Sequence, residues 1–422
     1  MSFSPWRRIG WRNLWRNPSR TLITALGLAV GYFAVVVIVS WTDGLTAQMI
    51  ENSTGLLMGQ VQVHSREYRP DRSIYDTIGG REGTNVEQVV AKLVNDPNIK
   101  AGAARVYASG LVSSGESTIA ATFMGVDHVA ESAVSRILNG LEDGVLPTVN
   151  ANELLVGTGM MKKLGITVGD EVVVVASAAD GSLGNDLFHV VGVYRTGLTD
   201  LDGSYAILPL ESLQTLVALE SGRIHEIGLA ATMTTDPWFA PEVAARLAET
   251  LRPFDLNIVV EPWTLLQPQM ASYVQLVESW HFIIIGVVFT VAIFGVANTM
   301  LIATFERRRE FAVMLALGTV PSQVLFAVLC EALILGVFSL LVGLVITLPL
   351  IFWFQSNPLD LSLFFDDFTM FGALMRPAFH LQFNGTIAVW AGLALLLTVL
   401  VAAIYPAGRA SRVPPADTLS GL

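Results

Sequence analysis

The sequence predicts an α+β membrane protein: four transmembrane helices, with a large, two-lobed α+β extracytoplasmic domain inserted between the first two. Three observations predict this fold class. Of the 422 residues, 52% are hydrophobic and only 14% are charged, whereas a soluble chain averages roughly a quarter charged residues. The chain nevertheless carries a formal net charge of −11. Long uncharged runs separate its charged residues, so the lipid-facing segments and an acidic, water-exposed block must be distinct parts of the chain.

The uncharged runs locate the four spans. The first covers residues 21–42, which are 22 residues without a charge. As a helix they would be about 33 Å long, enough to cross a hydrocarbon core of roughly 30 Å. The other spans are expected at about 280–305, 324–354 and 386–407, and Pro406 is expected to end the last one. Because the first run is longer than the apolar region of a signal peptide, we expect an uncleaved anchor.

Basic residues distinguish the two sides of the membrane. With Glu331 assigned to the membrane, the side that holds both termini carries ten basic residues against three acidic ones, and the other side carries 15 against 32, a net charge of −17. Short cytoplasmic segments are enriched in Lys and Arg, so residues 1–20 and the C-terminus are expected in the cytoplasm. The ten basic residues are Arg7, Arg8, Arg12, Arg16, Arg20, Arg307, Arg308, Arg309, Arg409 and Arg412.

Residues 43–278 are expected to form the extracytoplasmic domain. Short runs of β-branched and aromatic residues predict strands, and periodic apolar runs after helix-entry residues predict helices. The expected strands are Glu171–Ala176, Phe188–Tyr194, Ser204–Leu208 and Asn257–Val260, and the expected helices are Val86–Asn95, Val156–Leu164, Leu210–Leu219 and Pro241–Leu251. Pro262 and Pro268 are expected to mark the linker into the second span.

Residue patterns in the chain indicate no catalytic or metal site. The six histidines show no H-x-x-x-H spacing, no G-x-S-x-G motif occurs, and Cys330 is the single cysteine, so a zinc site, a hydrolase nucleophile and a disulfide within the chain are not expected. Asp200 and Asp202 lack the further ligands of a calcium loop and are interpreted as part of a turn. The acidic balance argues against a nucleic-acid partner.

The charged segment between the second and third spans is the most informative part of the sequence. Five consecutive charged residues, Glu306–Glu310, are followed by Phe311, Met314, Leu315 and Gly318, which share one face of a helix at spacings of i, i+3, i+4 and i+7. Such a helix, over about 306–318, could lie on lipid or fit the groove of a partner protein. The pattern alone leaves both possibilities open.

Several stretches resemble one family of membrane proteins. Asn298–Gly318, with Glu331–Ala332–Leu333 after it, resembles the permease domain of FtsX/MacB-type ABC transporters (type VII, mechanotransmission), and so do the head Trp11–Gly27 and the tail Ala403–Leu422. Within the soluble block, Leu164–Val172 and Thr196–Gln214 resemble the MacB-like periplasmic core domain. The likeness is greatest to lipoprotein-releasing permeases of the LolC/LolE type.

The resemblance implies a non-catalytic permease subunit, residues 280–422 being its FtsX-like domain. The chain contains no G-x-x-x-x-G-K-[ST] loop, so it is expected to bind no cofactor itself, and ATP and Mg are expected in a cytoplasmic ABC ATPase dimer. The family's coupling element would map onto Glu306, Arg307, Arg309, Glu310, Leu315 and Gly318. In that role the charged flanks would pair with the ATPase and the apolar stripe would sit in its groove.

Two further expectations concern the membrane segments. Gly27 and Gly31 form a G-x-x-x-G motif on the first span, which permits close helix approach within the chain or against a second permease chain, identical or paralogous. Glu331 is expected near the cytoplasmic end of the third span, in a structural role. The aromatic-rich loop 355–385 could touch lipid, substrate or the second permease.

The resemblance leaves three functions to be distinguished. The first is ATP-driven release of lipoproteins, or of a similar amphiphile, from the inner membrane of a bacterium, with the large domain in the periplasm. The second is MacB-like tripartite efflux of drugs or peptides. The third is FtsX-like regulation of a cell-wall hydrolase. We rank them in this order because the soluble block is large for the third function and resembles the lipoprotein-release pattern around Thr196–Gln214.

Overall fold

The computed structural model describes residues 16–69, 71–80, 84–115, 117–149, 151–232, 238–254 and 257–420. Arg7, Arg8 and Arg12, and the start of the family-like head at Trp11, lie outside the described residues. The chain divides into two compact units. We call the unit that comprises residues up to Thr46, Val274–Phe364 and residues from Ala378 onward the helical unit. The unit that comprises Ala47–Tyr273 and Phe365–Pro377 is the α/β unit.

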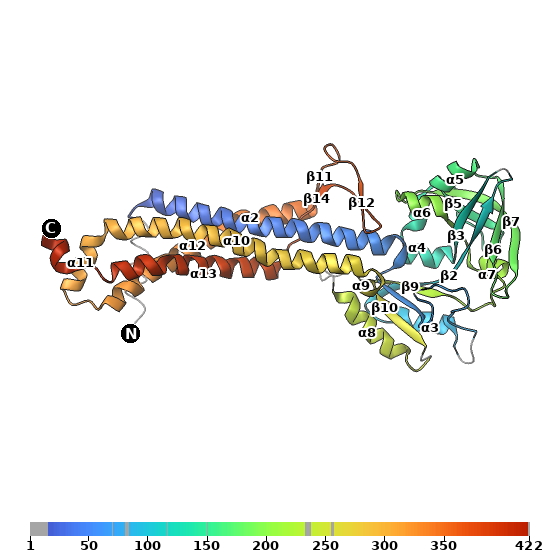
Figure 1. Cartoon of the computed structure of the whole chain (residues 1–422), viewed down its shortest axis with the longest axis horizontal. Coiled ribbons are helices and arrows are strands. Elements are labelled where there is room, and N and C mark those ends of the chain that lie inside the picture. The colour runs from blue at the N-terminus through green and yellow to red at the C-terminus, as the bar shows by residue number, and fades with distance from the viewer. Residues whose placement is uncertain are drawn as a thin grey trace. The chain divides into compact units, whose positions relative to one another are not determined.

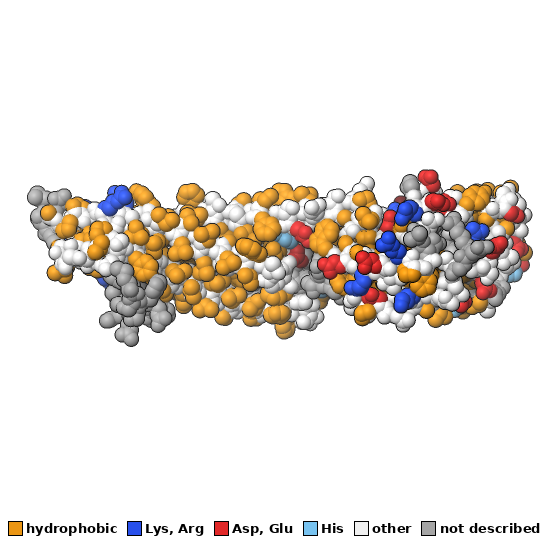
Figure 2. Space-filling view, turned by 90° about the horizontal axis from the view of Figure 1, so that it is seen from below, with side chains coloured by type: hydrophobic (Ala, Val, Ile, Leu, Met, Phe, Trp, Pro, Cys, Tyr) orange, Lys and Arg blue, Asp and Glu red, His pale blue; other side chains and the backbone are white. Residues whose placement is uncertain are grey.

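Four long apolar helices dominate the helical unit, and Figure 1 shows them running alongside one another. They are α2 (Pro18–Ser53), α10 (Pro268–Glu306), α12 (Pro321–Ser356) and α13 (Gly385–Ala410). Each is long and apolar enough to cross a membrane, so the prediction of four apolar helices is confirmed. Hydrophobic side chains cover most of the visible surface of these helices (Figure 2).

The helices are longer than the uncharged runs from which they were predicted. Helix α2 passes through Asp43 and continues to Ser53, after which a π-helical turn, η1 (Thr54–Met58), completes it. Helix α10 begins at Pro268, well before the predicted start at residue 280. Absence of charge marks the part of a helix that suits a hydrocarbon core, and it places no limit on the helix beyond that core.

The predicted end of the last span at Pro406 is wrong, because α13 continues through Pro406 to Ala410. Proline removes one backbone donor and crowds the preceding turn. Helices buried among membrane spans tolerate this loss, since neighbouring helices hold the segment in place. Pro406 and Ala407 are indeed buried, and Ser411 donates its N–H to the carbonyl of Ala407 at 3.0 Å.

Small residues bring α2, α12 and α13 together. A Cβ atom on Gly343 of α12 would lie 3.0 Å from the ring of Tyr32, and one on Gly336 would lie 3.3 Å from Leu396 of α13. The hydroxyl of Tyr32, which is buried, donates to the carbonyl of Ala388 at 3.2 Å. Close approach of this kind provides dispersion contacts where lipid supplies no hydrophobic driving force between helices.

A ten-stranded mixed sheet forms the frame of the α/β unit, in the order β10-β1-β9-β2-β3-β8-β5-β7-β4, with β6 pairing with β2 and β7. The strands are β1 (Val61–Ser65), β2 (Ile99–Ser113), β3 (Thr118–Val126), β4 (Leu141–Gly144), β5 (Glu153–Gly157), β6 (Glu171–Ser177), β7 (Leu183–Tyr194), β8 (Tyr205–Pro209), β9 (Glu226–Ala231) and β10 (Ile258–Pro262). The pairs β3–β8 and β5–β7 are parallel, and the other pairs are antiparallel.

Short helices pack on this sheet. They are α3 (Val86–Val94), α4 (His128–Val134), α5 (Thr158–Leu164), α6 (Thr199–Ser204), α7 (Leu210–Leu216), α8 (Phe239–Leu251) and α9 (Trp263–Leu266), with the 3₁₀ turn η2 (Ile137–Gly140). The predicted helix Val156–Leu164 is wrong in its first two residues, because Val156 pairs with Ala206 of β8 and with Val193 of β7. The two-lobed form of the domain stays a prediction.

The chain between α12 and α13 forms two small hairpins. Strand β11 (Leu359–Asp360) pairs with β14 (Ala378–Phe379), and β12 (Phe368–Met370) pairs with β13 (Ala373–Met375). Phe365–Pro377, which include β12 and β13, belong to the α/β unit. Two remaining short helices, α11 (Arg308–Ala316) and α14 (Pro415–Ser420), lie in the helical unit.

Candidate functional site

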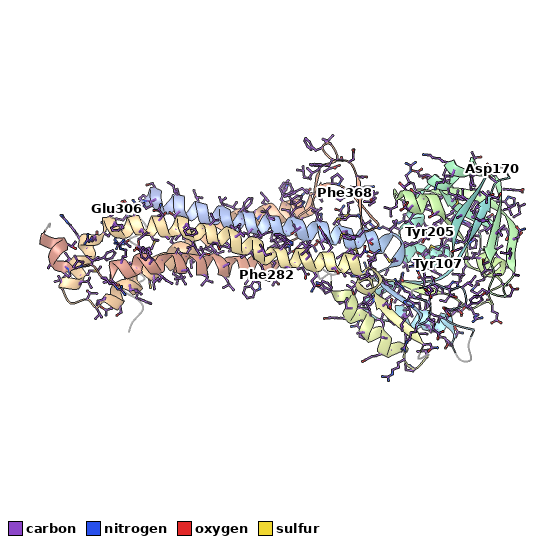
Figure 3. The ribbon with its side chains drawn as sticks, in the orientation of Figure 1. Tyr107, Asp170, Tyr205, Phe282, Glu306 and Phe368 are labelled. Atoms are coloured by element: carbon purple, nitrogen blue, oxygen red, sulfur yellow. The ribbon has the colours of Figure 1, made fainter. Side chains whose placement is uncertain are left out.

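The charged segment after the second long helix folds as a separate short helix. Helix α10 ends at Glu306 (Figure 3), Arg307 leaves the helical conformation with φ −98° and ψ 11°, and α11 then runs from Arg308 to Ala316. Gly318 ends it with φ +94°. The N–H groups of Gly318 and Thr319 donate to the carbonyls of Leu315 and Met314. These are the paired bonds of a Schellman motif, which favours glycine at this position.

Two arginines at the start of the chain's first long helix hold this segment. Arg20 of α2 donates both terminal nitrogens to the carboxylate of Glu306, at 2.7 and 2.6 Å. Arg16, just before α2, lies 2.5 Å from the carboxylate of Glu310. The hydrogen bond from Arg16 lowers the pKa of Glu310, and Arg307 adds to this effect against the opposing influence of burial.

Arg307 links the break between the helices to the third span. Its Nη1 donates to Glu331 of α12 at 2.7 Å, its Nε donates to Glu310 at 3.2 Å, and its guanidinium lies 5.2 Å from the ring centre of Phe311. Glu331 is thus a charged side chain within an apolar helix, and Arg307 of the same chain is its ion-pair partner. Bidentate and shared carboxylate contacts restrict geometry more than single surface pairs do.

The apolar side chains of the predicted stripe, Phe311, Met314 and Leu315, face the chain's own core in this structure. Phe311 and Ala312 are buried, and Met314 and Leu315 are partly buried against the core of the helical unit. The physical reason is that the chain turns at the break at Arg307, one helical turn before Phe311. This face therefore packs against the core of the helical unit.

A different set of side chains is exposed on and just after α11. Arg309 and Val313 lie one turn apart on the helix, and Val313 is 44% exposed. Leu317, the C-cap of α11, is 82% exposed, and Val320, which directly precedes α12, is 53% exposed. We call Arg309, Val313, Leu317 and Val320 the outer face. Of the six predicted coupling residues, Arg309 lies on it and Gly318 is exposed at its end, while Arg307, Glu310 and Leu315 contact the chain's own helices and Glu306 pairs with Arg20. Their coupling role stays a prediction.

The two glycines of the G-x-x-x-G motif lie in different surroundings. A Cβ atom on Gly31 would lie 3.7 Å from Val288 of α10, whereas one on Gly27 would meet no described atom within 4 Å. Gly27 is exposed. Gly31 therefore approaches a helix of the same chain, and the face around Gly27 is open along α2.

A buried ionic cluster in the α/β unit was not predicted from the sequence. Arg105 of β2 is completely buried and donates to both oxygens of Glu131, at 2.9 and 2.7 Å, and to Glu226 of β9 at 3.1 Å. Burial alone would lower the pKa of Arg105, but the two carboxylates outweigh it and hold that pKa well above its usual value. The sequence signal for this cluster was Arg105 itself, a charged residue among the apolar and small residues of Ile99–Ser113.

Two aromatic side chains complete this cluster. Tyr107 (Figure 3) donates its hydroxyl to Glu226 at 3.0 Å. Its backbone N–H donates to Nδ1 of His225 at 2.9 Å, so the proton of this imidazole sits on Nε2, which lies 3.1 Å from the carbonyl of Ile74. Burial lowers the pKa of His225 and raises that of Tyr107. All these groups are paired within the unit, which indicates a structural role.

The described residues show no cluster of three or more His, Cys, Asp or Glu side chains that could hold a metal ion. Asp202, considered above for calcium, accepts hydrogen bonds from the N–H and the hydroxyl of Thr196, at 2.8 and 2.7 Å, and from the N–H of Gly197. It therefore stabilises the turn that leads into α6.

Comparison with known proteins shows that the chain matches two protein families. The family described as MacB-like periplasmic core domain matches residues 21–250, and the FtsX-like permease C-terminal family matches residues 282–415. Among solved structures, the periplasmic region of MacB from Actinobacillus actinomycetemcomitans is similar to 53% of the chain over 97% of its own length, with a TM-score of 0.37 and 14% identity.

Curated relatives match over most of their length. The lipoprotein-releasing system transmembrane protein LolE of Haemophilus influenzae is 24% identical and covers 96% of both chains. The corresponding LolC protein of Neisseria meningitidis is 23% identical over 94% of this chain and 93% of its own. The macrolide export ATP-binding/permease protein MacB 1/2 of Paracoccus denitrificans is 22% identical over 84% of this chain but only 52% of its own.

Proposed function

Because the chain belongs to the FtsX/MacB family of ABC-transporter permeases, we propose that it is the transmembrane subunit of a complex that uses ATP hydrolysis to release lipoproteins from the inner membrane of a bacterium. The complex would pair this chain with a cytoplasmic ABC ATPase dimer and a second permease chain. Both termini would be cytoplasmic, and the α/β unit would lie in the periplasm.

The observation that carries the coupling part of the proposal is the way α11 is held. Glu310 of α11 pairs with Arg16, just before α2, and with Arg307. Arg307 in turn pairs with Glu331 of α12, and beside it Arg20 of α2 pairs with Glu306 of α10. The outer face is left to contact a partner. A force applied to that face would therefore act on all three helices together, without first unfolding the short helix.

Two of these helices extend from one unit into the other. Helix α2 runs from Pro18 to Ser53 and α10 from Pro268 to Glu306, whereas the division between the units falls at Thr46 and at Val274. A displacement of α11 would pass along continuous helices to the α/β unit. In this proposal ATP and Mg stay with the ATPase, and the permease supplies mechanical coupling.

Relatives named LolE and LolC support lipoproteins as the load, because they match this chain from end to end. The exposed face around Gly27 of α2 supports a second permease as the neighbour within the membrane, since glycine permits close approach of another helix.

Reconstitution in liposomes tests the proposal. The chain would be combined with its ATPase and second permease, and ATP-dependent transfer of a triacylated lipoprotein to a soluble acceptor would be measured. We expect release, and we expect Arg309→Glu with Leu317→Asp to lower release and lipoprotein-stimulated ATPase activity at least tenfold. Val129→Asp, at an exposed position of α4, is the matched control and should leave both unchanged.

Two results would contradict the proposal in different ways. Full coupling in the Arg309→Glu, Leu317→Asp variant would show that the outer face does not contact the ATPase. ATP hydrolysis without lipoprotein release, together with ATP-dependent efflux of a macrolide or a peptide, would reject lipoprotein release in favour of a MacB-like function. Hydrolysis that moves neither load would favour regulation.

A further inference from the structure

The α/β unit contains a pocket of ≈ 420 Å³ that no part of the coupling proposal uses. Its volume is within the range of about 300–1,000 Å³ typical of small-molecule sites. Four stretches far apart in sequence form its walls: the end of α2 with the η1 turn, the residues that lead into and begin α6, Gln267, and the β12–β13 hairpin. Its apolar lining comes from Leu56, Leu57, Met58, Leu198, Leu201 and Phe371.

The polar groups of this pocket do not provide a site for an anion. Ser53 donates its hydroxyl to Oε1 of Gln267 at 2.9 Å, and Nε2 of Gln267 lies 3.7 Å from the sulfur of Met58. Asp200 and Thr369 line the pocket as exposed residues. No Lys, Arg or His is among the lining residues, and a buried phosphate or carboxylate would need one.

Two unusual backbone conformations lie in the walls. The turn Thr54–Met58 is π-helical, a conformation that is rare and often found at functional sites. Phe371 has φ +49°, and Gly372 follows with φ +73°. Positive φ at both loop residues of a two-residue hairpin is the mark of a type I′ turn, for which Asn-Gly is preferred and a bulky aromatic is strained.

The contacts of the hairpin explain why a strained phenylalanine stays in place. Asn52 donates to the carbonyl of Leu374 at 2.7 Å, and Leu374 covers Gly197, where a Cβ atom would lie 2.7 Å from its side chain. The Phe371 ring lies 5.4 Å from the ring of Tyr273. The hairpin is thus fixed on one side, and its turn presents Phe371 to the pocket. Strain retained at a pocket wall points to a role in binding.

We propose that this pocket binds an alkyl chain of an acylated polypeptide and that Phe371 forms the wall that determines this specificity. The proposal rests on the proposed function, which supplies an acylated substrate. The lining supports it, because it combines six apolar side chains with no basic residue, which suits an alkyl chain whose polar end is uncharged or cationic. Its position along the chain also supports it: Ser53 ends the apolar helix α2, and Gln267 directly precedes α10.

A fluorescent label at the pocket tests the proposal in the full-length chain. Because Cys330 is the single cysteine, Cys330→Ala with Thr369→Cys gives one site for an environment-sensitive dye. The protein would be placed in nanodiscs of phosphatidylethanolamine and phosphatidylglycerol. The probe is a synthetic tripalmitoyl-cysteinyl peptide with a spin label on one palmitoyl chain. We expect a blue shift and saturable quenching with this probe, and neither with the same peptide lacking acyl chains.

The substitution Phe371→Asn separates binding from folding. Asn-Gly suits the turn, so the melting temperature should stay the same or rise, while the affinity for the acylated peptide should fall at least tenfold. Phe365→Asn is the matched control: Phe365 is an exposed phenylalanine of the same loop that does not line the pocket, and its variant should keep the affinity of the parent protein.

Three results would overturn the inference. They are no response of the label to the acylated peptide, equal affinity in the Phe371→Asn variant, and equal quenching by spin-labelled phospholipid of the disc, which would identify the ligand as bulk lipid. The assay contains no ATPase, so it is independent of release. A responding label without ATP-driven release would reject the proposed function alone, and release without a responding label would reject this inference alone.

Discussion

Replacement of Arg105 by methionine should destabilise the α/β unit strongly, because it leaves two carboxylates without their cation in the interior. Arg105 and Glu131 are completely buried, and Glu226 is 3% exposed. Removing one partner of a buried ion pair costs about 3–5 kcal/mol. For a unit of this size each kcal/mol lowers the melting temperature by roughly 2–4 °C, so Arg105→Met should lower it by about 6–20 °C at pH 7.

The pH dependence of this loss has a definite sign. Without Arg105, burial would favour the protonated, uncharged form of the Glu131 carboxyl over the carboxylate. Acid supplies that proton, so a lower pH removes the cost of the uncompensated charge. The deficit of the variant should therefore shrink on acidification. Melting of the full-length protein, followed by tryptophan fluorescence from pH 4.5 to 8, measures it.

A double variant and a surface control make this prediction refutable. Arg105→Met with Glu131→Leu removes the cation and one of its two carboxylates, while Glu226 stays charged and keeps its hydrogen bond from Tyr107, so part of the stability should return. Glu142→Gln breaks an exposed pair with Arg195 and should change the free energy of unfolding by no more than about 1 kcal/mol. If the double variant is as unstable as Arg105→Met, the loss comes from packing, and the reasoning from uncompensated charge is wrong.

Three smaller predictions concern the helical unit. Gly318→Ala should lower the free energy of unfolding by about 1 kcal/mol, because alanine disfavours the positive φ at the end of α11, and it should lower ATPase coupling in the liposome assay. Ala316→Gly, at the last residue of the helix, is the control and should lower ATPase coupling less, since no positive φ is involved. Equal losses in the two variants would refute the Schellman assignment. Arg16 is the chief cause of the lowered pKa of Glu310, so the ionised Glu310 stabilises the fold above the ordinary glutamate pKa and loses this contribution as the pH falls through the lowered pKa. The melting temperature of the parent protein should therefore fall below about pH 4 more steeply than that of Glu310→Gln. Parallel curves would contradict this. Gly343→Val should destabilise the packing against Tyr32, which a lower melting temperature in detergent would show, and Gly27→Val should leave the melting temperature of the single chain unchanged.

Charge and periodicity predicted the parts of this fold that depend on one chain segment at a time. The four apolar helices follow from uncharged runs, and strands β6, β7, β8 and β10 follow from runs such as Glu171–Ala176. Strands β2 and β3 were missed, β2 because Ala, Gly and Ser dominate it. Their stability comes from pairing: β2 contacts β3, β6 and β9, which no local pattern reveals.

The candidate site shows the same limit. The charged run and Gly318 indicated a short helix here, since charge and a terminal glycine are local signals, but the helix is Arg308–Ala316 and the predicted start, Glu306, is the last residue of α10. Which face of α11 packs inward depends on the break at Arg307 and on the pairing of that residue with Glu331, 24 positions later. The outer face with Val313 and Leu317 could therefore be identified only once the helices were placed around it.

Because it includes the hairpin Phe365–Pro377, the α/β unit is built from two separate segments of the chain. The chain passes between the units four times, at Thr46, Tyr273, Phe364 and Pro377. A chimera that moves only Ala47–Tyr273 into a relative would combine this segment with the relative's own hairpin. Asn52 and Gly197 would then contact that hairpin in place of their native partner Leu374. Recombination between such permeases is thus constrained to carry two separate gene segments together, and functional hybrids should be those that do.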